Sequence, residues 1–136
     1  MDLHELPFAK IIILREDIAE VVVDEGVELN LEMVNQYHDF LLSHLGPPFS
    51  LLINKLNSYT YTFDAQINLA NLKEINSMAV VAYNWVTRAS TAALANSVPR
   101  EKDWNIELFS NREEAWEWLL SEQESVATNS SHSCST

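Results

Sequence analysis

The stretch that decides the fold reads WNIELFSNREEAWEWLL, from Trp104 to Leu120. Its first residues alternate apolar with polar side chains, which is the period of a half-buried strand. Ser110 and Glu113 then form a capping box, in which each side chain accepts an amide proton at the start of a helix. Trp116 falls on the apolar stripe of that helix, whereas Trp118 falls on another face and is a candidate for an exposed contact. The stretch predicts a strand followed directly by a helix that packs on a sheet.

Two apolar runs near the amino terminus, 10–15 and 18–24, are separated only by the polar pair at 16 and 17. High strand propensity and the short polar connection predict a β-hairpin. Glu20 and Asp24 recur at even spacing, so we expect one face of this hairpin to be solvated.

Helices and strands alternate between the hairpin and the closing stretch. Asn30 predicts a helix start, and Gly46 predicts its end through a left-handed backbone. The later elements are a buried strand at 51–53, a short helix capped by Asp64, a central strand at 78–83 and a helix over 86–97. This order predicts an α/β domain with a mixed, mostly parallel sheet of about five strands and about four helices.

Composition indicates one domain and a reducing compartment. We divide the chain into an amino-terminal extension (1–9), an α/β domain (10–121) and a flexible Ser-rich tail (122–136). The single cysteine, Cys134, lies in that tail, so no disulfide framework is possible and the cytoplasm is the expected location. The apolar run at 11–14 is too short for a membrane span, so we expect no membrane insertion.

Charge argues against a nucleic-acid partner. Twenty acidic residues against eight basic residues give a net charge of −12, which repels phosphate backbones. A basic protein partner stays possible on the same grounds.

The residues offer little for catalysis. Only two glycines are present, so the sequence contains neither a glycine-rich phosphate-binding loop nor a dinucleotide-binding fingerprint. His38 and His44 are six residues apart on one predicted helix and face different ways, so they cannot share a metal ion. We therefore expect no enzyme, no metal and no cofactor.

The succession of elements resembles a known family. The leading hairpin, the central strand around Ala79-Val80-Val81-Ala82 and the closing motif at 108–119 resemble the STAS-like, or SpoIIAA-like, fold of anti-sigma-factor antagonists. The similarity covers roughly residues 10–120, and the nearest group consists of small, stand-alone bacterial members without an assigned function. The resemblance implies a non-enzymatic regulatory module that acts through a protein partner or self-association.

The resemblance also directs attention to the loop at 57–64. In antagonists of this fold, a Ser or Thr in the corresponding loop is phosphorylated within an Asp-Ser-x-Gly setting, which this loop lacks. Hydroxyl and carboxyl groups that could serve as phosphoacceptor or binding contacts are Ser58, Thr60, Thr62 and Asp64. An alternative reading is an extended connection whose aromatic side chains, Tyr59, Tyr61 and Phe63, pack on the domain.

Two places for a small ligand stay open. The loop at 57–64 follows a buried strand, and ligands of open parallel sheets bind at the carboxyl ends of the strands. A nucleotide, an anion or a lipid could occupy such a cleft. After the central strand, Arg88 could hold an anion, or it could pair with a nearby carboxylate in this acidic chain.

Overall fold

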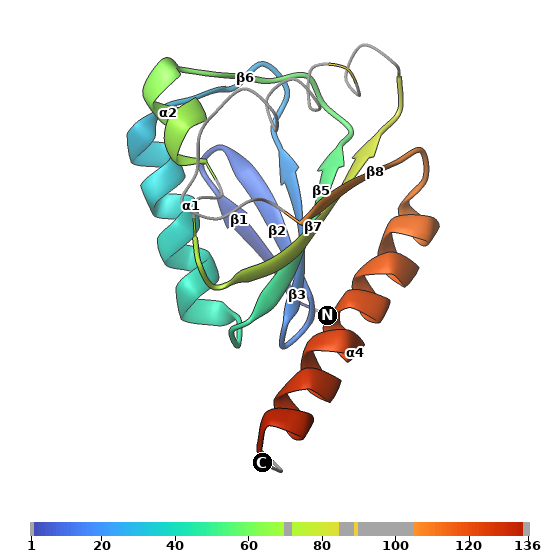
Figure 1. The fold of residues 1–136 in the computed structure, drawn as a ribbon. Helices are drawn as coiled ribbons and strands as arrows, with labels where there is room; N and C mark the ends of the chain where they lie inside the picture. The colour runs from blue at the N-terminus through green and yellow to red at the C-terminus, as the bar shows by residue number, and fades with distance from the viewer. Residues whose placement is uncertain (1, 70–71, 85–88, 90–104, 135–136) are drawn as a thin grey trace.

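Six strands form the main sheet, in the order β1-β2-β3-β5-β7-β8 (Figure 1). The structure is a computed structural model, and it describes residues 2–69, 72–84, 89 and 105–134. The main strands are β1 (Asp2–Leu6), β2 (Ala9–Arg15), β3 (Ile18–Val23), β5 (Phe49–Lys55), β7 (Ile75–Ala82) and β8 (Ile106–Phe109). Two short strands, β4 (Glu28–Leu29) and β6 (Thr60–Tyr61), form a small parallel sheet. The helices are α1 (Leu31–His44), α2 (Phe63–Asn68) and α4 (Arg112–Cys134).

The sheet is mixed, as predicted. Strands β1, β2 and β3 pair antiparallel, whereas β3, β5, β7 and β8 pair parallel. The predicted hairpin is confirmed, because β2 and β3 are joined by the two polar residues between them. Six main strands replace the five that we predicted. The predicted helix at 86–97 lies outside the described residues, apart from residue 89.

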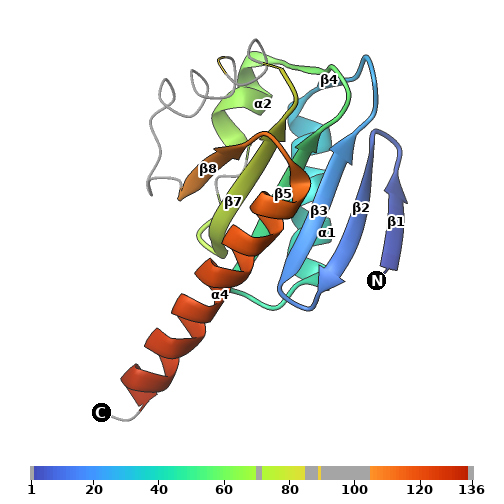
Figure 2. The same ribbon diagram turned by 90° about the vertical axis from the view of Figure 1, so that its right-hand side faces the viewer.

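Helices cover both faces of the sheet (Figures 1 and 2). Helices α1 and α2 lie on one face, and α4 crosses the other face over β5 and β7. On the α1 face, Leu41 packs in a large core with Ile11 and Phe49, whereas under α4 Leu119 packs with Leu52. Burial of each such side chain stabilises the fold by about 1.5–3 kcal/mol. Both faces of the parallel strands are therefore dry, which explains their unbroken apolar runs.

The amino-terminal residues belong to the sheet, so the predicted extension at 1–9 is wrong. Residues 2–6 form the edge strand β1, which pairs antiparallel with β2 and places Leu3 opposite Ile12. The pattern escaped detection because an edge strand leaves most of its side chains in solvent; Leu3 is 59% exposed. Only His4 and Leu6 are half-buried.

The carboxyl-terminal boundary is also wrong. We expected a flexible tail from residue 122, but α4 is a helix of 23 residues that continues to Cys134. At 1.5 Å per residue such a helix is about 34 Å long, against roughly 23 Å for a strand of seven residues. Helix α4 accordingly runs past the end of the sheet in Figures 1 and 2.

A buried glutamine anchors α4 to the rest of the domain beyond residue 121, where we expected the domain to end. Gln123 is only 5% exposed. Its Nε2 donates to Asp17 Oδ2 at 2.8 Å and to the Pro48 carbonyl at 3.1 Å, and its Oε1 accepts from Ser50 Oγ at 2.5 Å and Asn76 Nδ2 at 2.9 Å. Buried polar groups are almost always hydrogen-bonded. Gln123, which we had assigned to a flexible tail, makes these hydrogen bonds with the rest of the domain.

A side chain caps the start of each helix, and in α2 and α4 the capping residue differs from the predicted one. The Asn30 cap is confirmed, since its Oδ1 accepts from the Met33 amide at 2.9 Å. In α4 the cap is Asn111 instead of Ser110, because Asn111 Oδ1 accepts from the Glu114 amide at 2.9 Å. Ser, Thr, Asn and Asp cap almost equally well, so the sequence alone does not choose among neighbours.

The end of α1 does not use a left-handed glycine. The helix leaves through Leu45, which has an extended backbone with φ −116° and ψ 143°. The amide of Gly46 then donates to the Glu16 carbonyl at 2.8 Å, so the chain is held by the β2–β3 turn. Gly26 is the described glycine with a positive φ, at 78°.

The expected solvated face of the hairpin is found only in part: Lys10 is exposed and Ile12 is half-buried, whereas the start of α4 covers Glu20. Glu20 is 4% exposed and lies under the start of α4, where Arg112 Nη2 reaches Glu20 Oε1 at 2.7 Å. Trp118 is likewise half-buried, with its ring 5.8 Å from that of Phe109. Spacing within the hairpin cannot reveal a partner 92 residues away.

Candidate functional site

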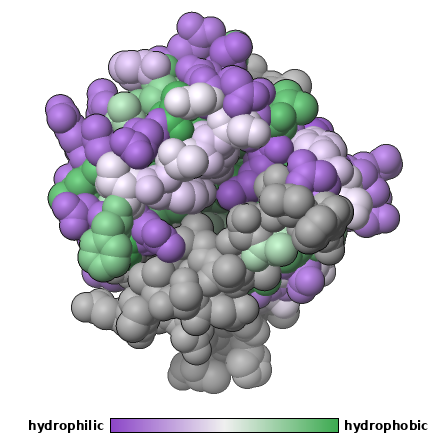
Figure 3. All heavy atoms as spheres, turned by 90° about the horizontal axis from the view of Figure 1, so that it is seen from above, coloured by the Kyte–Doolittle hydropathy of each residue, from purple (hydrophilic) through white to green (hydrophobic). Residues whose placement is uncertain are grey.

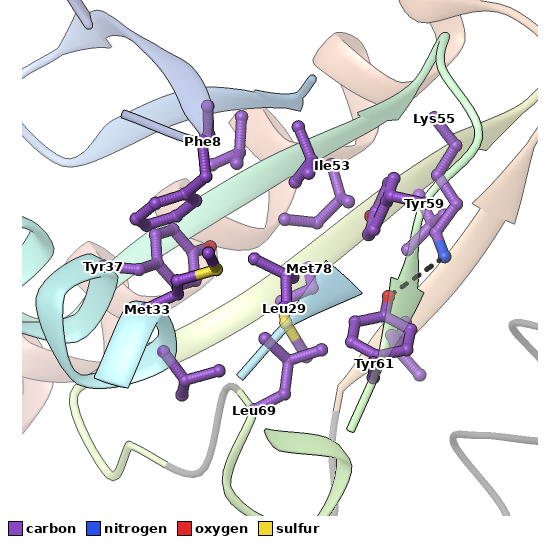
Figure 4. A pocket seen from close by; sticks show the side chains of 16 residues that line it. Phe8, Leu29, Met33, Tyr37, Ile53, Lys55, Tyr59, Tyr61, Leu69 and Met78 are labelled. Carbon is purple, nitrogen blue, oxygen red and sulfur yellow. Dashed lines mark hydrogen bonds between the residues drawn. The ribbon is translucent and has the colours of Figure 1, made fainter. Parts of the chain in front are cut away.

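A cavity of about 60 Å³ lies between the sheet and α1, toward the carboxyl ends of the parallel strands. Most of its walls are apolar. Figure 4 shows the side chains that enclose it. They are Phe8, Ala9, Val21, Val23, Leu29, Met33, Val34, Tyr37, Ile53, Lys55, Tyr59, Tyr61, Leu69, Met78, Val80 and Ile106.

Alternate residues of neighbouring strands form the floor of the cavity. Side chains two apart in a strand point to the same face. The register places Val21 beside Ile53 and Ile53 beside Val80, which gives one row across three parallel strands. The strand sequences that build the core therefore also build this floor.

Helix α1 supplies the opposite wall. The Asn30 cap sets where α1 begins, and Met33, Val34 and Tyr37 then follow on one face because they are spaced by about one turn. Val34 and Tyr37 are buried, and Met33 is half-buried. The thioether side chains of Met33 and Met78 make this part of the wall adaptable.

One cation and two tyrosines gather at one side of the cavity. Lys55 Nζ donates to the Tyr61 hydroxyl at 3.3 Å, and it lies 5.1 Å and 5.7 Å from the ring centroids of Tyr59 and Tyr61 (Figure 4). The two tyrosine rings meet edge to face, with centroids 5.6 Å apart. Burial raises the pKa of Tyr59 well above its ordinary value, and the neighbouring Tyr61 adds to the rise. Tyr59 therefore stays a neutral hydroxyl at neutral pH.

A third tyrosine reaches the cavity from α1. Tyr37 is 6% exposed, and Figure 4 shows its hydroxyl directed toward the interior of the cavity. Burial, and next to it Tyr61, raises the pKa of Tyr37 far above neutrality. Among the described residues no hydrogen-bond partner for this hydroxyl is found. A buried hydroxyl without a partner loses the hydrogen bonds that water would give it, which normally costs about 1–3 kcal/mol.

The loop at 57–64 contributes its aromatic residues to the cavity and keeps its hydroxyls outside. Strand β6 pairs with β4 through this loop, so Tyr59 and Tyr61 turn inward while Ser58 and Thr60 are exposed. The packing interpretation is confirmed for these two tyrosines. It is wrong for Phe63, which is 76% exposed.

The other predicted site residues are dispersed. Thr62 Oγ1 accepts from the Ala65 amide at 3.2 Å and caps α2, so the predicted cap at Asp64 is wrong; Asp64 lies exposed in the first turn. The structure does not bring Ser58, Thr60 or Asp64 together in one site. Arg88 lies outside the described residues.

A second polar cluster lies on the other face of the sheet, and the sequence reading missed it. Arg112 Nε is 3.0 Å from both oxygens of Glu20, and Asn54 Nδ2 donates to Glu20 Oε2 at 2.9 Å. The Tyr83 hydroxyl donates to Asn54 Oδ1 at 2.9 Å. Hydrogen bonds to Glu20 raise the pKa of Arg112. Both carboxylate oxygens of Glu20 accept hydrogen bonds, so the cluster holds the start of α4 on the sheet.

The described residues set limits on two other kinds of site. They contain no group of three or more His, Cys, Asp or Glu side chains that could hold a metal ion. None of the helices α1, α2 and α4 is long and apolar enough to cross a membrane.

The sheet order and its helical layers define a SpoIIAA-like fold, which confirms the predicted resemblance at the level of the fold. The structure is similar to that of an uncharacterised protein of the DUF3478 family, with a SpoIIAA-like fold, from Shewanella loihica PV-4. The TM-score is 0.54 at 16% sequence identity, over 87% of this chain and 90% of that chain. No protein-family model matches the sequence, and no curated protein matches it.

Proposed function

We propose that this protein is a non-enzymatic binding module of the SpoIIAA-like type that encloses a small, mainly apolar ligand between the sheet and α1. The cavity of about 60 Å³ carries this proposal. At about 24 cal/mol per Å³, an empty cavity of this size costs the fold roughly 1.4 kcal/mol. A ligand that fills the space recovers that free energy as binding.

The volume sets the size of the ligand. A water molecule needs roughly 10–15 Å³ of such space, so the cavity has room for about four to six non-hydrogen atoms. Met33 and Met78 can move to widen it slightly. A short alkyl chain or one small ring fits, whereas a nucleotide does not.

The chemistry of the lining supports binding over catalysis. Lys55 and three tyrosines are the titratable residues among the lining side chains. No carboxylate, histidine, serine or cysteine lines the cavity with them, so the commonest nucleophiles and general bases are missing from this set.

Methionine methyl groups provide a direct test. Met33 and Met78 line the cavity, and the third methionine of the chain lies outside the described residues. In a protein labelled with ¹³C at the methionine methyl groups, butan-1-ol, with five non-hydrogen atoms, should shift the signals of Met33 and Met78. Unchanged Met33 and Met78 signals at millimolar butan-1-ol would contradict the proposal.

A cavity-filling variant checks where the probe binds. Ala9 is 1% exposed and lines the cavity, so Ala9→Leu adds three carbons to the space. This variant should keep its cooperative thermal unfolding and lose the butan-1-ol shifts. Equal shifts in a folded Ala9→Leu variant would place the binding elsewhere.

A protein-interaction role is the second candidate, and it rests on α2. Phe63 and Ile67, one turn apart, are 76% and 38% exposed, whereas Ala65 is buried against the core. Figure 3 looks onto this end of the molecule and shows hydrophobic residues standing singly among hydrophilic ones. If α2 docks a partner or a second copy, Phe63→Ser should abolish the association in sedimentation or pull-down experiments. An unchanged partner and an unchanged sedimentation coefficient would count against this role.

Phosphorylation of the loop stays a prediction. The side chains of Ser58 and Thr60 are exposed, whereas Thr62 is engaged in its cap. We propose a cytoplasmic location, where a kinase could reach them. Intact-mass measurement of the protein from its native host should show an added 80 Da (roughly one phosphate). An unmodified mass under stress would remove this form of regulation.

A further inference from the structure

The polar groups of the cavity are hydrogen-bond donors. Lys55 carries an ammonium group with no acceptor capacity, and it donates to the Tyr61 hydroxyl at 3.3 Å. Because Tyr61 accepts this bond, its own proton turns away from Lys55, and its hydroxyl also shares a side-chain hydrogen bond with Tyr59. Tyr37 presents a further buried hydroxyl for which the described residues provide no partner.

The charge around the cavity is opposite to that of the chain. The protein has a net charge of −12, yet Lys55 is the charged residue among the sixteen lining side chains, and no Asp or Glu belongs to them. A net charge of −12 disfavours an anion on the protein as a whole. Here it meets one cation, hydroxyl donors and an apolar wall.

We infer that the ligand is a small apolar carboxylic acid, whose carboxylate binds Lys55 and the Tyr61 hydroxyl while its short tail fills the cavity. This inference rests on the proposed function and adds the chemical class of the ligand. The two donors lie close enough for one carboxylate to contact both, since Lys55 Nζ and Tyr61 Oη are 3.3 Å apart. The whole cavity of about 60 Å³ holds about four to six non-hydrogen atoms, so a carboxylate group of three leaves room for a tail of about one to three carbons.

The apolar part of the cavity excludes a purely polar anion. Met33, Ile53 and Met78 offer no hydrogen bonds, and burying a second charged group against them would be unfavourable. A ligand with one charged end and one apolar end satisfies both parts. Inorganic phosphate and nucleotides satisfy only one.

The test compares two probes of equal chain length, butanoate and butan-1-ol, in methyl-labelled protein at pH 7. Butanoate is ionised at this pH, whereas butan-1-ol is neutral. Charge-assisted hydrogen bonds favour the charged probe by about tenfold or more, so butanoate should bind at least tenfold more tightly than butan-1-ol. Both probes should shift the signals of Met33 and Met78.

Two lysine variants assign the preference to its source. Lys55→Met removes the cation and keeps an unbranched side chain, so butanoate should lose at least tenfold in affinity while butan-1-ol changes less than about twofold. Lys73→Met makes the same charge change at an exposed lysine outside the cavity, and it should leave both affinities unchanged.

Each outcome decides between the two proposals. If butan-1-ol binds and butanoate binds no more tightly, or if the preference survives in Lys55→Met, the carboxylate inference is overturned and the apolar site stands. If neither probe shifts Met33 and Met78 in the wild type, both proposals fail. A preference lost in Lys55→Met and kept in Lys73→Met establishes the inference.

Discussion

Removal of the Arg112 side chain should destabilise the fold more than removal of a charged side chain whose partner is exposed, because the partner of Arg112 is the buried Glu20. The Glu20 side chain is 5% exposed and its partner Arg112 is 45% exposed. Breaking a buried ion pair from one side costs about 3–5 kcal/mol, because the remaining charge is left unpaired. Water can reach the exposed side of Arg112, and Asn54 still donates to Glu20, so we expect a smaller loss of about 2–3 kcal/mol for Arg112→Met.

Urea unfolding with a matched control measures this loss. Arg15→Met breaks the exposed ion pair with Asp17 and should cost less than about 1 kcal/mol. In the double variant with Glu20→Gln, the buried charge is gone, so about 1–2 kcal/mol of the loss from Arg112→Met should return. The midpoint should move while the slope with urea stays constant. Equal losses for Arg112→Met and Arg15→Met, or strict additivity in the double variant, would refute the claim that Glu20 is a buried charge paired with Arg112.

Three further predictions concern a cap, the end of α4 and pH. Thr62→Ala should destabilise the fold by about 1 kcal/mol by removing the α2 cap, and Asp64→Ala by only a few tenths, as thermal unfolding would show; the reverse order would restore the cap predicted from the sequence. Gln123→Leu should cost about 2–3 kcal/mol in urea unfolding because buried partners lose their bonds, whereas the exposed Glu124→Leu should stay within about 0.5 kcal/mol; equal effects would mean that α4 is not held there. Burial lowers the pKa of His38 in the folded protein, so as the pH falls below about 6.5 His38 is protonated in the unfolded chain before it is protonated in the folded one, and the free energy of unfolding should decrease. His38→Gln should flatten this part of the stability profile against pH. An unchanged profile in this variant would contradict the prediction.

Local patterns predicted the elements whose causes are local. The hairpin, the Asn30 cap and the buried strands around Leu52 and Val80 all follow from propensity, spacing and capping chemistry within a few residues. The inward turn of Tyr59 and Tyr61 was also readable, because alternation in an extended segment sends every second side chain to the same side.

Long-range pairing accounts for what the sequence did not reveal. From the sequence alone Glu20 is predicted to be solvated, because its partner Arg112 is far away in the chain. Gln123 is likewise predicted to lie in a flexible tail, because its partner Ser50 is distant in sequence. The cavity depends on side chains from eight strands and helices, so no single segment carries its signature. Lys55 was overlooked because one lysine at a strand end is unremarkable without the two tyrosines that surround it.

The apolar cavity itself can be tested by pressurising crystals of the protein with xenon. Xenon enters dry, apolar cavities and gives a strong anomalous signal. We predict a xenon site between Met33, Ile53 and Met78 in the wild type, and its loss in the Ala9→Leu variant. A crystal structure in which these side chains close the space, with no xenon bound there, would contradict the claim that this protein keeps an internal site for an apolar ligand.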